Sequence, residues 1–246
     1  MNLILIFHVY IYNILIIKLL TIIIWQVFLT LFLFINHLVY ICADQLSIMS
    51  KAERTKQFII EEAASIFNEK GIAGTSIDDI LKATKLAKGC LYNHFESKEE
   101  LSYASVDYLL GKLTERREIT IAKETTARGK IYAFMENHKN PLHSLFDGGC
   151  PIVNIGTEAD DTSPVIKKKI RNTLETAIKT FTKILQDGID CGELSAELDP
   201  EEYATKMFMA IEGSNATCRV LNSARPMQLV IKSLKRELEK YSLIPN

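Results

Sequence analysis

The side chains with the clearest chemical role lie between residues 74 and 101. Lys88, Tyr92, Asn93, His94 and Lys98 follow one another closely. Lysine neutralises phosphates, and tyrosine and histidine hydrogen-bond phosphate oxygens. Asparagine and lysine pair with adenine and guanine edges in the major groove, and Gly89 would let the backbone approach a duplex. Each residue taken singly is as readily an ordinary surface or core residue, whereas the ordered set predicts contact with DNA.

The elements that would position these side chains are short helices. Apolar residues at helical spacing predict a helix over 54–70, which ends at Gly71. Both Thr75 with Asp78 and Ser76 with Asp79 fit an N-cap followed three residues later by an acid. Either pair would start a helix that reaches residue 83 or 84.

A second short helix is predicted over 88–95, after a gap of four residues. Ser97 with Glu100 forms a further capping pair that starts the next helix. Two short helices joined by a tight turn make a helix-turn-helix, whose second helix enters the major groove. The expected small core beneath them consists of Ile77, Ile80, Leu81, Leu86, Leu91 and Phe95, and Lys82, Lys85, Lys88 and Lys98 would face phosphates.

This segment resembles the TetR/AcrR family of bacterial regulators. The resemblance rests on Gly-Thr-Ser-Ile-x-x-Ile at 74–80 and Lys-Gly-x-Leu-Tyr-x-His-Phe-x-Ser-Lys-x-x-Leu at 88–101. It implies an all-α protein: a three-helix DNA-binding domain at 49–97, followed by a helical effector-binding and dimerisation domain at 98–246. It also implies a homodimeric repressor that binds double-stranded operator DNA and is released by a small molecule. By resemblance, Thr75 or Ser76, Tyr92, His94 and Lys98 contact phosphates, and Lys88, Gly89, Cys90 and Asn93 face the bases.

Two positions depart from the family pattern. Lys85 stands in the turn where glycine is usual, and Ala87 stands where the recognition helix usually has a serine or threonine cap. A missing cap hydroxyl costs about 1 kcal/mol. A helical interaction protein that has lost DNA binding is therefore one alternative, and salt-dependent binding to DNA upstream of the gene would distinguish the two.

The region after residue 98 reads as all-helical. Helices are expected over 101–123, 127–138, 163–187, 199–221 and 226–241, with 141–161 as the least regular part. In the family the last two helices pair across a two-fold axis. The apolar residues of these helices fit that role and fit an intramolecular core equally well: Met207, Phe208, Ile211, Val220, Leu229, Leu234 and Leu238.

The effector site is the weakest part of the prediction, because mixed apolar and polar residues are its only signal. For each candidate, packing or solvent exposure is the competing interpretation, and the identity of the effector does not follow. The candidates are Phe134, His138, His143, Phe146, Asn154, Glu158 and Met209.

Composition argues against other classes of protein. The formal net charge of −1 gives no support to general binding of polyanions, so DNA contact requires a local arrangement of charge. The five cysteines show no metal-ligand spacing, and neither a metal nor a cofactor is expected. An enzyme built on Cys150, His143 and Asp147 is the main rival, but no catalytic fingerprint accompanies these residues.

The first 48 residues differ from the rest of the chain. They are almost entirely apolar, and Lys18 and Asp44 are the only formal charges. The favoured interpretation is a mis-assigned start, with Met49 as the first residue of a cytoplasmic regulator. The alternative is a membrane-anchored regulator with its DNA-binding domain in the cytoplasm, because residues 3–41 would suffice for a transmembrane span. The N-terminal peptide of the native protein would decide between them.

Overall fold

The fold is all-α in a computed structural model that describes residues 20, 23–36 and 50–243. No strand occurs in these ranges, where the only extended pairing is an isolated bridge between Leu194 and Ser242. The chain divides into two units, residues 1–55 and 56–246. The all-helical prediction is therefore confirmed for the part of the chain that is described.

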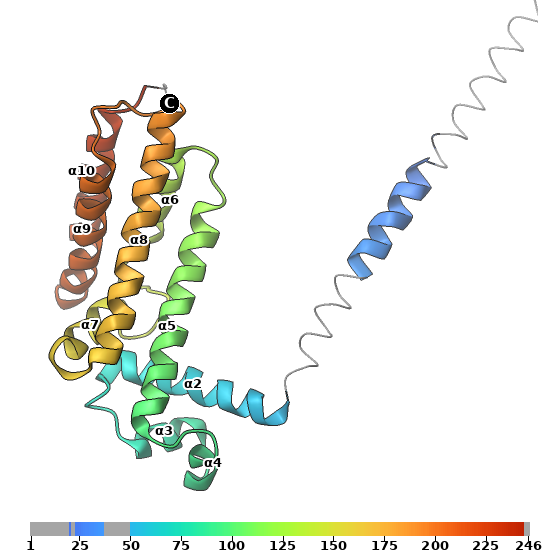
Figure 1. Ribbon diagram of the computed structural model, residues 1–246, viewed down its shortest axis with the longest axis vertical. Coiled ribbons are helices and arrows are strands. Elements are labelled where there is room, and N and C mark those ends of the chain that lie inside the picture. Colours follow the sequence, from blue (N-terminus) through green and yellow to red (C-terminus); the bar gives the residue numbers. More distant parts are fainter. Residues whose placement is uncertain (1–19, 21–22, 37–49, 244–246) are drawn as a thin grey trace, which may run out of the picture. The chain divides into compact units, whose positions relative to one another are not determined.

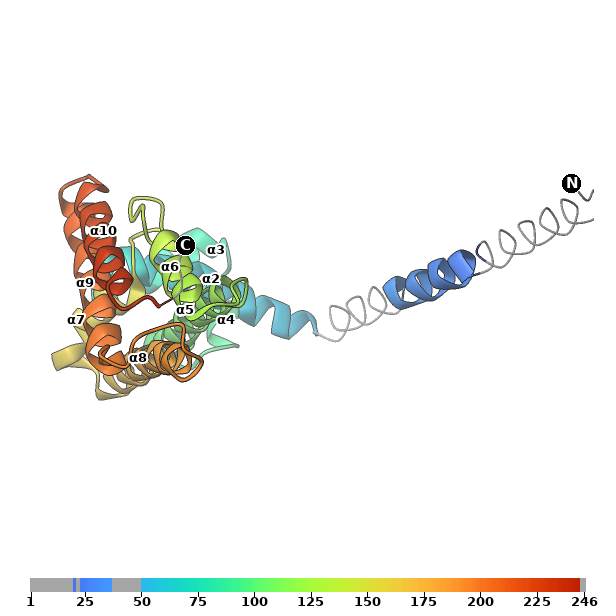
Figure 2. The ribbon, with the colours of Figure 1, turned by 90° about the horizontal axis from the view of Figure 1, so that it is seen from above.

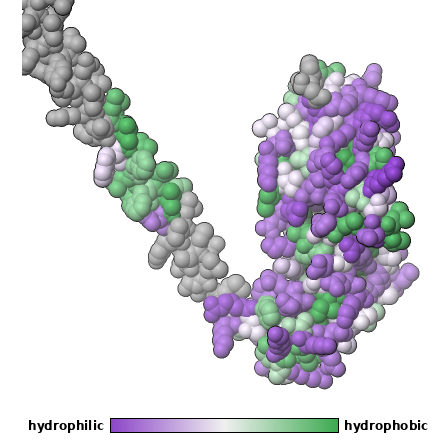
Figure 3. All heavy atoms as spheres, turned by 180° about the vertical axis from the view of Figure 1, so that it is seen from behind, coloured by the Kyte–Doolittle hydropathy of each residue, from purple (hydrophilic) through white to green (hydrophobic). Residues whose placement is uncertain are grey.

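The described part of the first 48 residues is helical over residues 23–36. Its large apolar side chains, among them Trp25 and Phe28, are about half to three-quarters exposed at 49–75%, and Figure 3 shows apolar residues covering this helix. Most of the expected span over 3–41 lies outside the described residues. Among residues 20, 23–36 and 50–243, no helix combines the length and apolarity needed to cross a membrane.

Three helices form the DNA-binding unit, and the last two of them are the predicted helix-turn-helix (Figure 1). They are α2 (Lys51–Lys70), α3 (Ile77–Thr84) and α4 (Lys88–Tyr92). The second helix of the motif is shorter than the predicted 88–95, because the turn after Tyr92 brings Phe95 back into the core. That core contains Ile59, Ala63, Phe67, Ile80, Leu91, Phe95 and Leu101, with Ile77, Leu81 and Leu86 packed against it.

Six helices lie between residues 98 and 243 of the described chain. Capping side chains start several of them: Ser97, Thr126, Ser163 and Asp199 each accept a hydrogen bond from a backbone N–H of the first turn. The helices are α5 (Lys98–Ile121), α6 (Ala127–Asn137), α7 (Pro151–Thr162), α8 (Pro164–Asp190), α9 (Pro200–Val220) and α10 (Arg225–Glu239). Of the segment 141–161, expected to be the least regular part, residues 141–150 form turns, whereas Pro151 occupies the first turn of a regular helix and starts α7.

Two apolar clusters hold these helices together. One joins α7 to α5 and α8 through residues such as Leu109, Ile155 and Ile170. The other joins α6, α8, α9 and α10, with Phe181 and Phe208 at its centre. Helices α9 and α10 lie side by side in both views (Figures 1 and 2) and bury one face against α6 and α8. The core around Met207, Phe208, Ile211, Leu234 and Leu238 is thus intramolecular.

Candidate nucleic-acid interface and regulatory cavity

A capping box of side-chain to backbone hydrogen bonds starts the first helix of the helix-turn-helix, α3. The Ser76 hydroxyl accepts from the Asp79 N–H at 3.1 Å, and the Asp79 carboxylate accepts from the Ser76 N–H at 2.9 Å. An ion pair with Lys70, together with the Ser76 hydrogen bonds, holds the pKa of Asp79 well below its ordinary value. Of the two capping pairs that the sequence offers, this one starts α3.

The turn itself shows both departures that were noted in the sequence. Lys85 is left-handed, with φ of 58°, where glycine would be unstrained. Ala87 is the N-cap of α4 and provides no side-chain hydrogen bond. The motif therefore forms with a strained residue in the turn and an uncapped recognition helix.

The outer face of α4 carries most of the predicted DNA contacts. Lys88, Gly89, Tyr92 and Asn93 are exposed, and a Cβ added at Gly89 would have no other atom within 4 Å. The Lys88 Nζ lies 5.9 Å from the centroid of the Tyr92 ring. The opposite face is anchored by the buried Leu91, which fixes the direction in which the outer face points.

The remaining predicted contacts differ in their access to solvent. Cys90, His94 and Lys98 are partly exposed, and Ser76 is exposed while its hydroxyl donates to Asp79 at 2.6 Å. Thr75 lies apart from this surface: it is 1% exposed and its hydroxyl donates to the Gly71 carbonyl. Of the two hydroxyls proposed at this position, only that of Ser76 is accessible.

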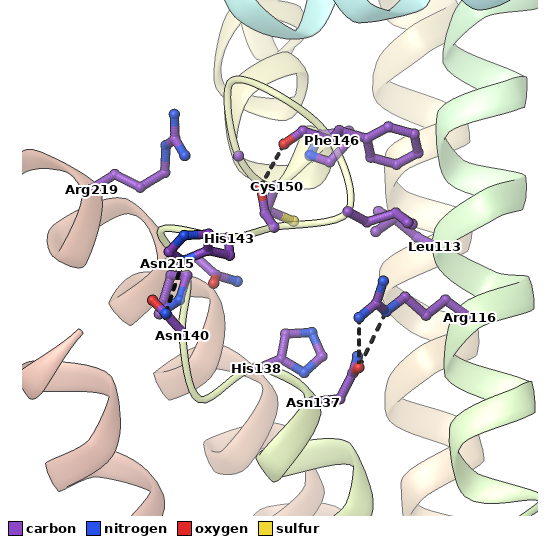
Figure 4. Close-up of a pocket in the computed structure, with 15 residues that line it drawn as sticks. Leu113, Arg116, Asn137, His138, Asn140, His143, Phe146, Cys150, Asn215 and Arg219 are labelled. Atoms are coloured by element: carbon purple, nitrogen blue, oxygen red, sulfur yellow. Dashed lines mark hydrogen bonds between the residues drawn. The ribbon is translucent and has the colours of Figure 1, made fainter. Parts of the chain in front are cut away.

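A cavity lies between α5, α9 and the segment that connects α6 to α7 (Figure 4). Three of the seven effector candidates line it, namely His138, His143 and Phe146. Arg116 and Arg219 line it from α5 and α9 on opposite sides. Sequence reasoning missed both arginines and Asn137 and Asn215, since nothing in the local sequence indicates that these positions meet.

The other four candidates do not line this cavity. Phe134 belongs to the aromatic core, with its ring centroid 4.3 Å from that of Phe181. Met209 is 47% exposed on α9. Asn154 and Glu158 hydrogen-bond backbone groups at the end of α2 and the start of the next loop.

Those last contacts join the cavity wall to the DNA-binding helices; we call them the α2–α7 contacts. Asn68, at the end of α2, donates to the carbonyls of Asp147 and Gly149 at 2.6 and 3.0 Å. Asn154 on α7 donates to the Asn68 and Gly148 carbonyls at 3.1 and 2.9 Å. Gly148 has φ of +84°, and a Cβ there would meet the Asn68 carbonyl oxygen at 2.7 Å, so this position requires glycine.

Glu158 completes the α2–α7 contacts. Its two carboxylate oxygens accept from the N–H groups of Ile72 and Ala73 at 2.8 and 2.6 Å. These amides belong to the segment between α2 and α3. The helix that borders the cavity is thereby tied directly to the segment that positions the helix-turn-helix.

Cys150 at the cavity wall does not form the nucleophilic pair considered from the sequence. Burial and the neighbouring Glu212 carboxylate raise the pKa of its thiol well above the ordinary value. A neutral thiol is a poor nucleophile. His143 instead makes a 2.9 Å contact with the Asn140 side chain through its Nδ1.

Family models match both halves of this architecture. Residues 59–104 match the model of bacterial regulatory proteins of the tetR family, and residues 127–234 match a tetracyclin repressor-like C-terminal domain. A TetR transcriptional regulator from Chloroflexus aurantiacus is 33% identical, with a TM-score of 0.76, over 79% of this chain and 98% of that one. The chain belongs to the TetR family.

Other TetR-family proteins support this assignment. A regulator from Cytophaga hutchinsonii is 32% identical with a TM-score of 0.75, over 80% of this chain and 99% of that one. The transcriptional repressor DhaR of Mycobacterium sp. is 25% identical over 173 residues, 70% of this chain and 86% of its own. The regulator CifR, 21% identical with a TM-score of 0.66 over 74% and 95% of the two chains, shares the fold and was solved with a 26-base-pair operator DNA. The chain is accordingly a helix-turn-helix transcriptional regulator and not an enzyme.

Proposed function

We propose that this chain is a homodimeric repressor that reads its operator with the outer face of α4 and is released by a small molecule bound in the cavity. The proposal rests mainly on α4 having one face packed on the core and an opposite face exposed to solvent. Leu91 and Phe95 lock the helix onto the core, while Lys88, Tyr92 and Asn93 remain on the surface. That arrangement suits a recognition helix in the major groove.

The proposed contacts fall into two kinds. Tyr92, His94, Ser76 and Lys98 are placed to position the protein on phosphates, which carry no sequence information. Lys88, Gly89, Cys90 and Asn93 are placed to face base edges. Thr75 contributes by holding the loop through its bond to Gly71.

Dimerisation is proposed through the outer faces of α9 and α10. Met209, Gly213, Ala216 and Val220 are exposed at spacings of three and four residues, so they form one stripe along α9. Val220 is 86% exposed and Leu229 on α10 is 58% exposed, unusual values for apolar residues within ordered helices. Gly213 and Ala216 at the middle of the stripe would let two helices approach closely.

The effector is assigned to the cavity lined by His138, His143 and Phe146, because the α2–α7 contacts connect that cavity to the helix-turn-helix. A ligand that displaced the 147–149 segment would act on Asn68, and through it on α2. Domains 49–97 and 98–246 thus have separate roles, with these contacts as their junction. The fold shared with CifR, which was solved on operator DNA, supports the proposed operator binding.

The test is binding to double-stranded DNA from upstream of the gene, measured by fluorescence anisotropy at several salt concentrations. Tyr92→Ala and Lys98→Ala should weaken binding to every sequence, whereas Asn93→Ala should change which sequence is preferred. Lys179→Ala, which removes a charge from the distant α8, is the matched control and should bind as the unmodified chain does. Equal effects of all four substitutions would contradict the proposed interface.

A further inference from the structure

Arg117 is a buried arginine without a partner. Its side chain is 8% exposed, and its Nε has no hydrogen-bond partner. None of the ion pairs formed by the described residues includes it. Burial lowers the pKa of the guanidinium, yet arginine keeps its charge at any ordinary pH. A buried charge costs free energy unless it is paired, so this residue requires an explanation.

Arg117 lies where the two apolar clusters of the regulatory domain meet. Leu113, four residues before it on α5, packs against the cluster of α5, α7 and α8. Ile121, four residues after it, packs against the cluster of α6, α8, α9 and α10. Residues four apart share one face of a helix, which places Arg117 on the inward face between them. A position of this kind serves packing better with a leucine than with an arginine.

The cavity described above is lined by the preceding turn of α5, and Arg117 itself lies outside its lining. Leu113 and Arg116 line it, and none of its lining residues is an aspartate or a glutamate. Arg116 and Arg219 supply positive charge from opposite sides, and Asn137, Asn140 and Asn215 supply amide groups (Figure 4). The neighbouring carboxylate is that of Glu212, which lies against the Cys150 thiol and near His138. Apolar walls come from Leu113, Leu145 and Phe146.

We propose that the effector is a small organic carboxylate whose charged group pairs with Arg117 and whose apolar body occupies the cavity beside Leu113 and Phe146. The proposal rests on the assignment of the effector to this cavity. A guanidinium binds a carboxylate through two parallel N–H···O hydrogen bonds, and the unpartnered Nε of Arg117 can donate one of them. The carboxylate would reach Arg117 past Leu113, one turn along α5, and would supply a hydrogen-bonded counter-charge, which the adjacent Glu118 does not provide.

The test is thermal unfolding of the full chain with straight-chain monocarboxylates of increasing length. Primary amides of the same lengths serve as neutral controls, and alkyl phosphates test the alternative anion. We expect carboxylates to raise Tm and to bind roughly tenfold or more tightly than the matched amides, since hydrogen bonds to charged groups are the stronger kind. Equal stabilisation by amides, or stabilisation by phosphates alone, would overturn the proposal.

Arg117→Met separates binding from packing. Without ligand this variant should unfold at a higher temperature, because an apolar side chain of similar length replaces an unpaired buried charge. It should lose the carboxylate response and keep operator binding. Arg171→Met, an exposed arginine on α8, is the control and should change neither property. Arg117→Met with a lower Tm and an unchanged carboxylate response would show that Arg117 is structural.

Operator binding measured on the same samples keeps the two proposals apart. Operator DNA released by neutral compounds but not by carboxylates would leave the proposed repressor intact and refute the carboxylate. A carboxylate shift that depends on Arg117, in a chain that binds no DNA, would support the ligand site and refute the repressor.

Discussion

We expect that replacing Lys85, the strained residue in the turn of the helix-turn-helix, by glycine stabilises the protein. Lys85 has a left-handed backbone with φ of 58° and is exposed. An L-residue in this conformation costs about 1–2 kcal/mol relative to glycine. The added flexibility of glycine in the unfolded chain offsets about 0.4–1 kcal/mol of that. Lys85→Gly should therefore raise the free energy of unfolding by about 0.5–1 kcal/mol, even though it removes a side chain.

A second substitution acts on the neighbouring helix. Ala87 is the N-cap of α4 with extended backbone and provides no side-chain hydrogen bond, so Ala87→Ser would add a cap worth about 1 kcal/mol. For a domain of this size, about 1 kcal/mol corresponds to roughly 2–4 °C in Tm. We expect about 2 °C from Lys85→Gly alone and roughly twice to three times that from the pair, measured by calorimetry.

Lys82→Gly is the matched control. It removes the same charge and introduces the same residue on the exposed side of α3, where the helical backbone gives glycine no advantage. It should destabilise by about 1 kcal/mol. If Lys85→Gly were no more stable than Lys82→Gly, the strain assigned to the turn would be refuted. If Lys85 also pairs with a phosphate, Lys85→Gly should reduce the slope of log K against log salt by about 0.9.

Two further predictions concern the junction and the dimer. Glu158→Gln keeps one acceptor for the amides of Ile72 and Ala73 but loses the charge, so we expect the free energy of unfolding to fall by about 1–2 kcal/mol, reduced because the site is partly exposed. The effect of effector on operator affinity should also weaken. Glu175→Gln on the exposed side of α8 is the control, and an unchanged effect of effector in Glu158→Gln would rule out this route. Val220→Asp should shift the chain from dimer to monomer in sedimentation and weaken operator binding, because it places a charge in the proposed apolar interface. Ile119→Asp, at a 54% exposed position on α5, should stay dimeric, and a dimeric Val220→Asp would place the interface elsewhere.

Much of the DNA-binding half was determined by the sequence alone. The spacing of apolar residues and the capping residues predicted α2, α3 and the start of α4, and the residues expected beneath them do form the core. Lys85 and Ala87 stood out in the sequence as departures from the family pattern, and they are the left-handed turn residue and the uncapped start of α4. These features are local: helix periodicity, caps and turns depend on residues within a few positions of one another, so a single sequence contains the information.

The tertiary structure decided everything that depends on separate helices meeting. It buried Thr75 and exposed Ser76, although both pairs fit the same capping pattern. Glu158 and Asn154 contact the end of α2 and the following loop instead of the cavity, and Arg116 and Arg219 line the cavity. The tertiary structure also left the Nε of Arg117 without a hydrogen-bond partner at the junction of two cores. Such features arise from side chains far apart in sequence, and neither helix period nor composition records which of them become neighbours.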